Sequence, residues 1–196
     1  MTRTGTRTEQ KERTRRTLLA TGRRLFATRG YAGVGVAEIV RESGVTKGAL
    51  YHHFSGGKTD LFRAVLEDVH REVAGRVAAA AEAEGDPWAR LKAGCAAFVA
   101  AGADPEVQRI MLIDGPAVLG WNEWRALDEA AAFQHLTEAL SALVADGTIP
   151  AQPVAPLARL LSGAMNEAAL WLAQSAPADL AGTQAALSRL LDALRA

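Results

Sequence analysis

Three runs of apolar residues near the N-terminus predict three helices, the last two of them joined by a tight turn. Within each run the apolar positions recur every three or four residues, as on one face of an amphipathic helix. Gly44 lies where the chain must turn sharply, and Thr46 is placed to cap the helix that follows. This spacing is typical of a helix-turn-helix. The apolar positions are Leu18, Leu19, Leu25, Phe26, Val36, Ile39, Val40, Leu50 and Phe54.

The rest of the chain keeps a helical period and has no alternation that would predict strands. Apolar residues between positions 61 and 77 predict a long fourth helix that connects two parts of the chain. Glycine and proline then divide the remainder into about five helices. We therefore expect an all-α fold, with an N-terminal helix-turn-helix domain of three helices at residues 12–72 and a helical C-terminal domain at residues 73–196. The expected breaks are at residues 85–87, 102–105, 115–116, 147–153 and 175–177.

The outward face of the third predicted helix carries residues that suit a nucleic acid groove. Lys47 and His52 can contact phosphates or guanine edges, and the Tyr51 hydroxyl can reach a phosphate. Gly48 lets the start of the helix approach a duplex closely. A solvated helical hairpin could carry any one of these residues, so it is their combination that favours DNA. The candidate contacts on this helix are Thr46, Lys47, Gly48, Tyr51, His52 and His53, with packing of His53 against the first helix as its alternative role.

Charge is divided unevenly along the chain, although the net charge is zero. Residues 1–58 contain twelve Lys and Arg against four Asp and Glu, a net +8, and the remaining residues carry −8. The basic excess surrounds the predicted helix-turn-helix, which favours a nucleic acid partner. A membrane-surface segment would also be basic, but no long apolar run accompanies these residues, so we expect no membrane partner. Residues 1–11 are expected to form a disordered basic arm that follows the DNA, or else a solvated tail.

The sequence predicts neither a metal site nor a catalytic site. Cys95 is the only cysteine, so no intramolecular disulfide can form and a reducing cytoplasm is the expected compartment. We expect Cys95 to be a buried, inert thiol, with a redox sensor as the alternative. The four histidines lack metal-ligand spacing, and the common motifs of zinc proteases, nucleotide-binding loops and serine hydrolases are absent. We therefore expect no enzyme, no metal and no cofactor, although a triad assembled from scattered residues would leave no such motif.

From about residue 13 to residue 69 the chain resembles the TetR family of bacterial transcriptional regulators. The resemblance rests on Phe26, Gly30 and Tyr31 at the end of the first helix, on the segment AEIVRESGVTKGALYHHF, and on Lys58 and Leu61 at the start of the fourth. The turn, the cap, the aromatic residues and the apolar spacing must all coincide, which makes the pattern specific.

The resemblance implies a cytoplasmic homodimer that binds a palindromic double-stranded DNA operator and a small-molecule effector. It further implies a transcriptional regulator, most often a repressor that the effector releases from DNA. It adds Lys58 to the DNA-binding residues, as a phosphate contact. The alternative is a helical ligand-binding protein or dimeric scaffold without sequence-specific DNA binding, against which Lys47 and Tyr51 are both in place.

Two positions depart from the family pattern. Gly35 stands where Ser or Thr usually caps the second helix, and it is a weaker cap. The loop from Ser55 to Gly57 has one residue more than usual. We therefore expect a looser start to the fourth helix and a less secure phosphate contact from Lys58.

The last two predicted helices, residues 154–173 and 178–194, carry wide apolar faces. Small residues at Ser162, Gly163 and Ala164 would let another helix approach closely. In TetR-like proteins the corresponding pair forms a four-helix dimer interface, and the resemblance implies the same here. The alternative is that both faces only close the core of the monomer.

Aromatic and sulfur-containing residues of the C-terminal part could line an apolar cavity for an effector, although many such residues only fill a core. Asp114 and Asn166 are polar residues among apolar neighbours, and a buried polar group requires a partner, which an effector could supply. Alternatively, Asp114 caps the turn at Gly115, and Asn166 pairs with Glu167 across the dimer. The candidate effector-binding residues are Phe98, Met111, Asp114, Trp121, Trp124, Phe133, Met165, Asn166 and Trp171.

Overall fold

The structure is a computed structural model that describes residues 7–174 and 179–195, and the elements in these ranges are all helical. The expected all-α fold is therefore confirmed. The elements of the N-terminal part are α1 (Arg7–Arg29), α2 (Val36–Ser43), α3 (Lys47–His53) and α4 (Lys58–Glu82). Those that follow are α5 (Pro87–Gly102), α6 (Pro105–Val107), the π-helix η1 (Gln108–Asp114), α7 (Gly115–Leu119), α8 (Trp121–Glu129), α9 (Ala132–Ala145), α10 (Val154–Gln174), α11 (Leu180–Asp192) and the 3-10 turn η2 (Ala193–Arg195).

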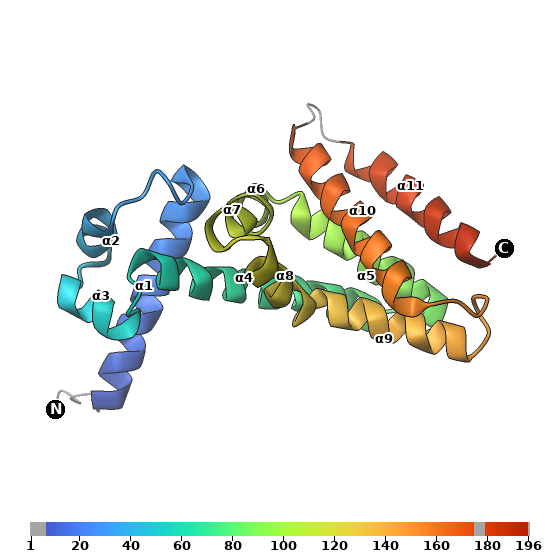
Figure 1. The fold of residues 1–196 in the computed structure, drawn as a ribbon, viewed down its shortest axis with the longest axis horizontal. Coiled ribbons are helices and arrows are strands. Elements are labelled where there is room, and N and C mark those ends of the chain that lie inside the picture. Colours follow the sequence, from blue (N-terminus) through green and yellow to red (C-terminus); the bar gives the residue numbers. More distant parts are fainter. Residues whose placement is uncertain (1–6, 175–178, 196) are drawn as a thin grey trace.

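The molecule is elongated, with α1, α2 and α3 gathered at one end and α5, α9, α10 and α11 at the other (Figure 1). Helix α4 runs from the first group toward the second, and the short elements α6, α7 and α8 lie between them (Figure 1). The predicted domain boundary at residues 72 and 73 falls inside this unbroken helix, so the boundary remains a prediction.

Aromatic and aliphatic side chains from α1 to α4 form the core of the N-terminal part. Phe26 and Phe62 are fully buried and meet edge to face, with ring centroids 5.3 Å apart. Ile39 of α2 and Leu50 of α3 are also fully buried. Gly44 ends α2 with a φ of 67°, a left-handed conformation that glycine adopts without strain. The turn therefore brings α3 into contact with α1.

Two expectations about loops and ends are wrong. Helix α1 begins at Arg7, so residues 7–11 are helical rather than part of a disordered arm; residues 1–6 lie outside the described part. The loop before α4 is held firmly instead of loosely, because the Asp60 carboxylate accepts hydrogen bonds from the Gly56 amide, at 2.6 Å, and from the Ser55 hydroxyl. The same contacts keep the pKa of Asp60 below its usual value, with the Gly56 hydrogen bond as the main cause.

The helix break expected at residues 115–116 is also wrong. The π-helix η1 continues directly into α7, and the turn comes at Gly120, where φ is 79°. Pro116 is the second residue of α7 and has no N–H to donate to the preceding helical turn. Gly115 is needed for packing, because a Cβ there would lie 2.8 Å from the Trp124 ring.

Polar contacts tie α1 and α4 to the short elements that follow α5. Each contact joins residues at least 60 positions apart in the chain. The pairs are Arg23 with Glu106, Arg63 with Glu123, and the Tyr31 amide with the Asp114 carboxylate. Helix α1 and the loop after it therefore contact α6 and η1, and α4 contacts α8.

Candidate nucleic-acid interface and ligand cavity

Helix α3 is capped at its start and presents its polar side to solvent. The Thr46 hydroxyl accepts a hydrogen bond from the Ala49 amide at 3.1 Å, which satisfies one of the amide groups left unpaired at a helix N-terminus. Lys47, Gly48 and His52 are exposed, whereas Leu50 faces the core. The residues predicted to contact DNA from this helix are thus available to a partner.

Tyr51 is exposed and is positioned by the loop that follows α3. Its ring lies so close to Gly57 that a Cβ at that glycine would be 3.0 Å from the ring. Gly57 also has a φ of 66° and donates its amide to the Phe54 carbonyl at 2.8 Å. The longer loop therefore supports the Tyr51 ring, which the sequence alone did not indicate.

His53 is half-buried at the end of α3, beside His52 and Phe54. Burial is the largest cause that lowers its pKa, and the charges of His52, Lys11 and Arg15 lower it further. The Arg15 guanidinium also lies 5.7 Å from the centre of the Phe54 ring. His53 therefore lies beside the basic side of α1. This position is consistent with its alternative role of packing against the first helix.

Lys11 and Arg15 are basic residues of α1 that lie near the end of α3. Lys11 belongs to the basic arm expected to follow the DNA, whereas Arg15 was not predicted to contact it. The two are four positions apart and share a face of α1, so a helical period extended back to residue 11 would have placed them together. Their positive charges lower the pKa of His53 at the end of α3. The positive surface at this end therefore combines side chains of α1 and α3.

Lys58 is engaged within the protein. Its ammonium donates to the carbonyls of Tyr31, at 3.0 Å, and Val34, at 2.9 Å, and lies 3.8 Å from the centre of the Tyr31 ring. These contacts fasten the loop after α1 to the start of α4. An ammonium group has three N–H donors, so one remains for a phosphate.

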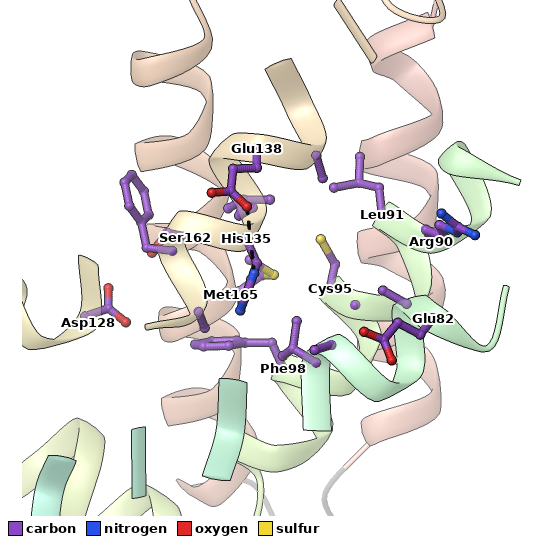
Figure 2. A pocket seen from close by; sticks show the side chains of 18 residues that line it. Glu82, Arg90, Leu91, Cys95, Phe98, Asp128, His135, Glu138, Ser162 and Met165 are labelled. Atoms are coloured by element: carbon purple, nitrogen blue, oxygen red, sulfur yellow. Dashed lines mark ion pairs between the residues drawn. The ribbon is translucent and has the colours of Figure 1, made fainter. Parts of the chain in front are cut away.

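A cavity of about 470 Å³ lies in the C-terminal part, among α4, α5, α8, α9 and α10 (Figure 2). Of the predicted effector residues, Phe98, Phe133 and Met165 line it. Leu91 and Leu136 add to its apolar wall, and Figure 2 shows the Cys95 sulfur pointing into the space. Its size falls in the range that accommodates a drug-sized molecule.

Cys95 is buried, and burial raises the pKa of its thiol to about 12. A thiol with such a pKa stays protonated at neutral pH and reacts slowly. The structure therefore agrees with an inert thiol rather than with a redox sensor.

Asp128 is the buried acid of the cavity, with 2% of its surface exposed. Its carboxylate pairs with Arg125 at 2.8 Å, and the same guanidinium nitrogen is 3.3 Å from the Ser162 hydroxyl. Burial raises the pKa of Asp128 to about 6, against the opposing charge of Arg125 and with a small further rise from Glu129. The remaining charged residues of the lining are exposed; they are Glu82, Arg90 and Glu138, with His135 beside Glu138.

Three predicted effector residues instead form the packing around η1. The Trp124 indole nitrogen donates to the Met111 carbonyl at 2.7 Å, and both side chains are buried. Asp114 accepts the Tyr31 amide at 2.6 Å and makes no side-chain cap at α7, so its expected capping of the turn at Gly115 is wrong. These residues join the two parts of the molecule and do not line the cavity.

The other three, Trp121, Asn166 and Trp171, also lie outside the cavity lining. Trp121 is exposed at the start of α8 and lies against Trp124, with ring centroids 5.0 Å apart. Asn166 has a buried side-chain oxygen without a hydrogen-bond partner among the described residues. Trp171 is exposed on α10.

The apolar surface of α10 divides into two faces. One face packs into the core through Leu161, Met165 and Leu172. The other is exposed, with Leu160 at 72% and Trp171 at 51% of their full surface. The apolar residues of α10 therefore do more than close the core of the monomer.

The described residues contain neither a cluster of metal ligands nor a membrane-spanning helix. No group of three or more His, Cys, Asp or Glu side chains among them could hold a metal ion. None of their helices is both long enough and apolar enough to cross a bilayer.

Comparison with known proteins gives matches to both parts of the chain. A family model described as "Bacterial regulatory proteins, tetR family" matches residues 18–65. A second model, described as "Tetracyclin repressor-like, C-terminal domain", matches residues 88–194. A solved structure of a TetR-family transcriptional regulator from Pectobacterium atrosepticum is 36% identical, with 97% of each chain covered and a TM-score of 0.79.

More distant relatives share one region or the fold alone. The HTH-type transcriptional regulator LmrA of Bacillus subtilis is 37% identical over 79 residues, which are 40% of this chain and 42% of that protein. The chain thus matches less than half the length of this curated relative. The regulator FadR of Bacillus subtilis, solved in complex with stearoyl-CoA, is 16% identical over 90% of this chain and 96% of its own, with a TM-score of 0.75. That likeness extends to the fold alone.

Proposed function

The chain belongs to the TetR family of bacterial transcriptional regulators, and from this premise we propose that it is a one-component repressor. It binds a palindromic operator as a homodimer and leaves the operator when a small molecule occupies the C-terminal cavity. Regulators of this family bind DNA operators, dimerise and bind small-molecule ligands. The proposal assigns the protein to the cytoplasm and gives it no enzymatic activity and no cofactor.

The observation that carries the proposal is the capped and exposed face of α3. Lys47 and Tyr51 project from a short helix that Leu50 anchors in the core, as an element that enters a major groove requires. Lys11 and Arg15 of α1 extend the positive surface toward the phosphates. The rest of the chain is acidic, so the attraction to DNA is concentrated at this end.

A second copy of the chain is the partner that we propose for the exposed apolar face of α10. Leu160 and Trp171 would be covered there, and Gly163 and Ala164 would allow the helices to approach closely. A two-fold dimer presents two α3 helices to consecutive major grooves, about 34 Å apart. The palindrome of the operator would then reflect the symmetry of the protein.

The route from the cavity to the DNA surface is proposed to pass through α8 and η1 as well as along α4. Asp128 of the cavity and Trp124 lie four residues apart on one face of α8. Trp124 holds the Met111 carbonyl of η1, and η1 ends at Asp114, which holds the Tyr31 amide. A ligand that displaces α8 would therefore shift the support of α1 and change the separation of the two α3 helices.

Selection of bound sequences from a random DNA library with the purified protein tests the proposal. We expect a sequence with two-fold symmetry to be enriched. The Leu160→Glu variant should lose the symmetric site because it cannot dimerise, whereas Ile113→Glu, which changes an exposed apolar residue of η1, should retain it. Recovery of no preferred sequence would favour a helical ligand-binding protein without sequence-specific DNA binding.

A further inference from the structure

The ligand cavity has an apolar wall and an acidic lining. Among the described residues that line it, Glu82, Asp128 and Glu138 carry negative charge and Arg90 alone is a lysine or arginine. Asp128 is almost fully buried, while the other three charged groups are exposed at the edge. Figure 2 shows Asp128 on one side of the cavity and Glu82 and Arg90 on the other. A ligand that fills the cavity therefore meets one carboxylate away from solvent.

Arg125 is hydrogen-bonded to one oxygen of the Asp128 carboxylate, which leaves acceptor positions for a ligand. Arg125 reaches one carboxylate oxygen, Oδ2, and the same guanidinium nitrogen also approaches Ser162. Arg125 itself does not line the cavity, and its charge is shared with Glu129 at 3.6 Å. A carboxylate has about four acceptor positions, so a donor from the cavity side can be added to this arrangement.

The two aromatic side chains of the lining have different neighbours. Phe98 and Phe133 line the cavity, and the guanidinium groups of Arg125 and Arg159 lie 4.8 and 5.6 Å from the centre of the Phe133 ring. The Phe98 ring has no such cation among the described residues. Its face is therefore available to the apolar body of a ligand. An anionic head group beside Asp128 would instead meet like charge, since Arg90, the arginine of the lining, lies on the other side of the cavity.

We propose that the effector is a lipophilic amine, bound as its cation, with its apolar body against Phe98, Leu136 and Met165 and its ammonium group donating to Asp128. This inference rests on the proposed function, in which the cavity is the effector site. Asp128 is the residue that selects the head group. A neutral alcohol of the same shape could donate to Asp128, but a hydrogen bond between two charged groups is stronger.

Three probes that share one aromatic body and differ in the head group test the inference: 2-naphthylmethylamine, 2-naphthalenemethanol and 2-naphthoic acid. Calorimetric titration of the full chain at pH 7.5 should give tighter binding of the amine than of the alcohol, by about tenfold or more, and the weakest binding for the acid. Equal or tighter binding of the alcohol or the acid, or no binding of any probe, would overturn the inference.

Substitution of Asp128 identifies the selecting group. In Asp128→Asn the advantage of the amine over the alcohol should largely disappear, and in Glu84→Gln, which changes an exposed acid outside the lining, it should persist. A thermal melt of each variant checks its folding, and the comparison of probes on the unaltered protein stands even if Asp128→Asn does not fold. Retention of the full preference in a folded Asp128→Asn variant would contradict the assignment.

A gel-shift titration with the selected operator separates this inference from the proposed function. If the amine binds through Asp128 but does not release the operator, the ligand class stands and the repressor proposal fails. If the alcohol or the acid binds more tightly and releases the operator, the repressor proposal stands and the ligand class fails.

Discussion

The two ends of the molecule differ in charge and in construction. At the DNA end, exposed basic and aromatic side chains project from one helix of seven residues. At the other end, the cavity is assembled from five helices, and its buried charge is negative. A contact on an exposed helix face can be altered without disturbing the fold. A group inside the cavity touches the helices that enclose it, so filling the cavity can move them. This difference suits one end to recognition and the other to control.

The largest expected difference between the two ends is their response to salt. DNA binding through phosphates releases counterions, with a log-log slope of about −0.9 for each phosphate neutralised, so six to ten contacts would weaken binding about 10³- to 10⁵-fold between 50 and 200 mM salt. Binding of the naphthyl amine beside buried Asp128 should change far less, because water and ions are largely excluded there. Titration of each partner across this salt range would measure both slopes, and a flat response for DNA would contradict the assignment of the basic end.

Lys47 and Tyr51 are exposed on α3. We therefore expect Lys47→Ala and Tyr51→Ala each to weaken operator binding by roughly 1–3 kcal/mol without unfolding the protein. Tyr51 packs against Gly57 only at the surface, so the cost to folding should be small. Leu50→Ala is the matched control on the inward side of the same helix, and it should destabilise the fold by about 2–5 kcal/mol. Gel-shift titrations and chemical denaturation measure the two effects. Normal operator affinity in both surface variants would remove α3 from the DNA interface.

A buried histidine between the two ends predicts a loss of stability in acid. His70 of α4 is 3% exposed, its Nε2 has no hydrogen-bond partner among the described residues, and burial lowers its pKa to about 4. The unfolded chain, with a pKa near 6.5, takes up the proton first, so the free energy of unfolding should fall by about 2 kcal/mol between pH 7 and pH 5 from this residue.

Asp128 opposes this trend. Its pKa of about 6 in the folded protein lies above the unfolded value, so the folded state takes up that proton first and gains stability as the pH falls toward 4. The His70→Leu variant isolates the histidine contribution, since both proteins contain Asp128. Urea denaturation at pH 7 and pH 5 should show about 2 kcal/mol less acid destabilisation in the variant, and His135→Gln at an exposed position should match the parent protein. Equal pH dependence in all three proteins would mean that His70 is not buried as described.

The smallest expected effect is the pH dependence of DNA binding. His53 has a lowered pKa in the free protein, and nearby phosphates would favour its charged form, so operator binding should strengthen as the pH falls from 7.5 to 6. We expect a change of less than about tenfold per histidine. His53→Gln and His52→Gln would divide the effect between the half-buried and the exposed ring. If the double variant keeps the full pH dependence, neither histidine is its source.

The helix-turn-helix was largely predictable from the sequence because residues close together in the chain determine it. The spacing from Val36 to Phe54, with Gly44 and Thr46 between, fixes two helices and their turn within 19 residues. The support of Tyr51 by Gly57 and the engagement of Lys58 with Tyr31 were not predictable, because the first depends on a φ angle and the second on a contact 27 residues away.

The cavity was only partly predictable because it depends on how separate helices meet. Trp124 and Asp128 lie one turn apart on α8, yet one supports η1 and the other lines the cavity. Its size and aromatic character made Trp124 a predicted cavity residue, but Trp124 lies outside the lining and Asp128 lies in it. Asp128 was missed because an acid between Leu127 and Glu129 resembles an ordinary solvated residue of a helix. Only the packing of α8 against α9 and α10 buries it.

If ligand binding in the cavity and operator binding at α3 oppose each other, calorimetry can measure the coupling between them. The dissociation constant of the most tightly bound naphthyl probe is measured with the free protein and with the protein saturated by its selected operator. Because coupling between two sites is reciprocal, the operator should weaken the probe by about 5- to 150-fold, and Asp114→Ala, which removes the contact with Tyr31, should reduce that factor. A dissociation constant that the operator leaves unchanged would mean that ligand binding and operator binding are not coupled and that the C-terminal part serves only as a dimerisation module.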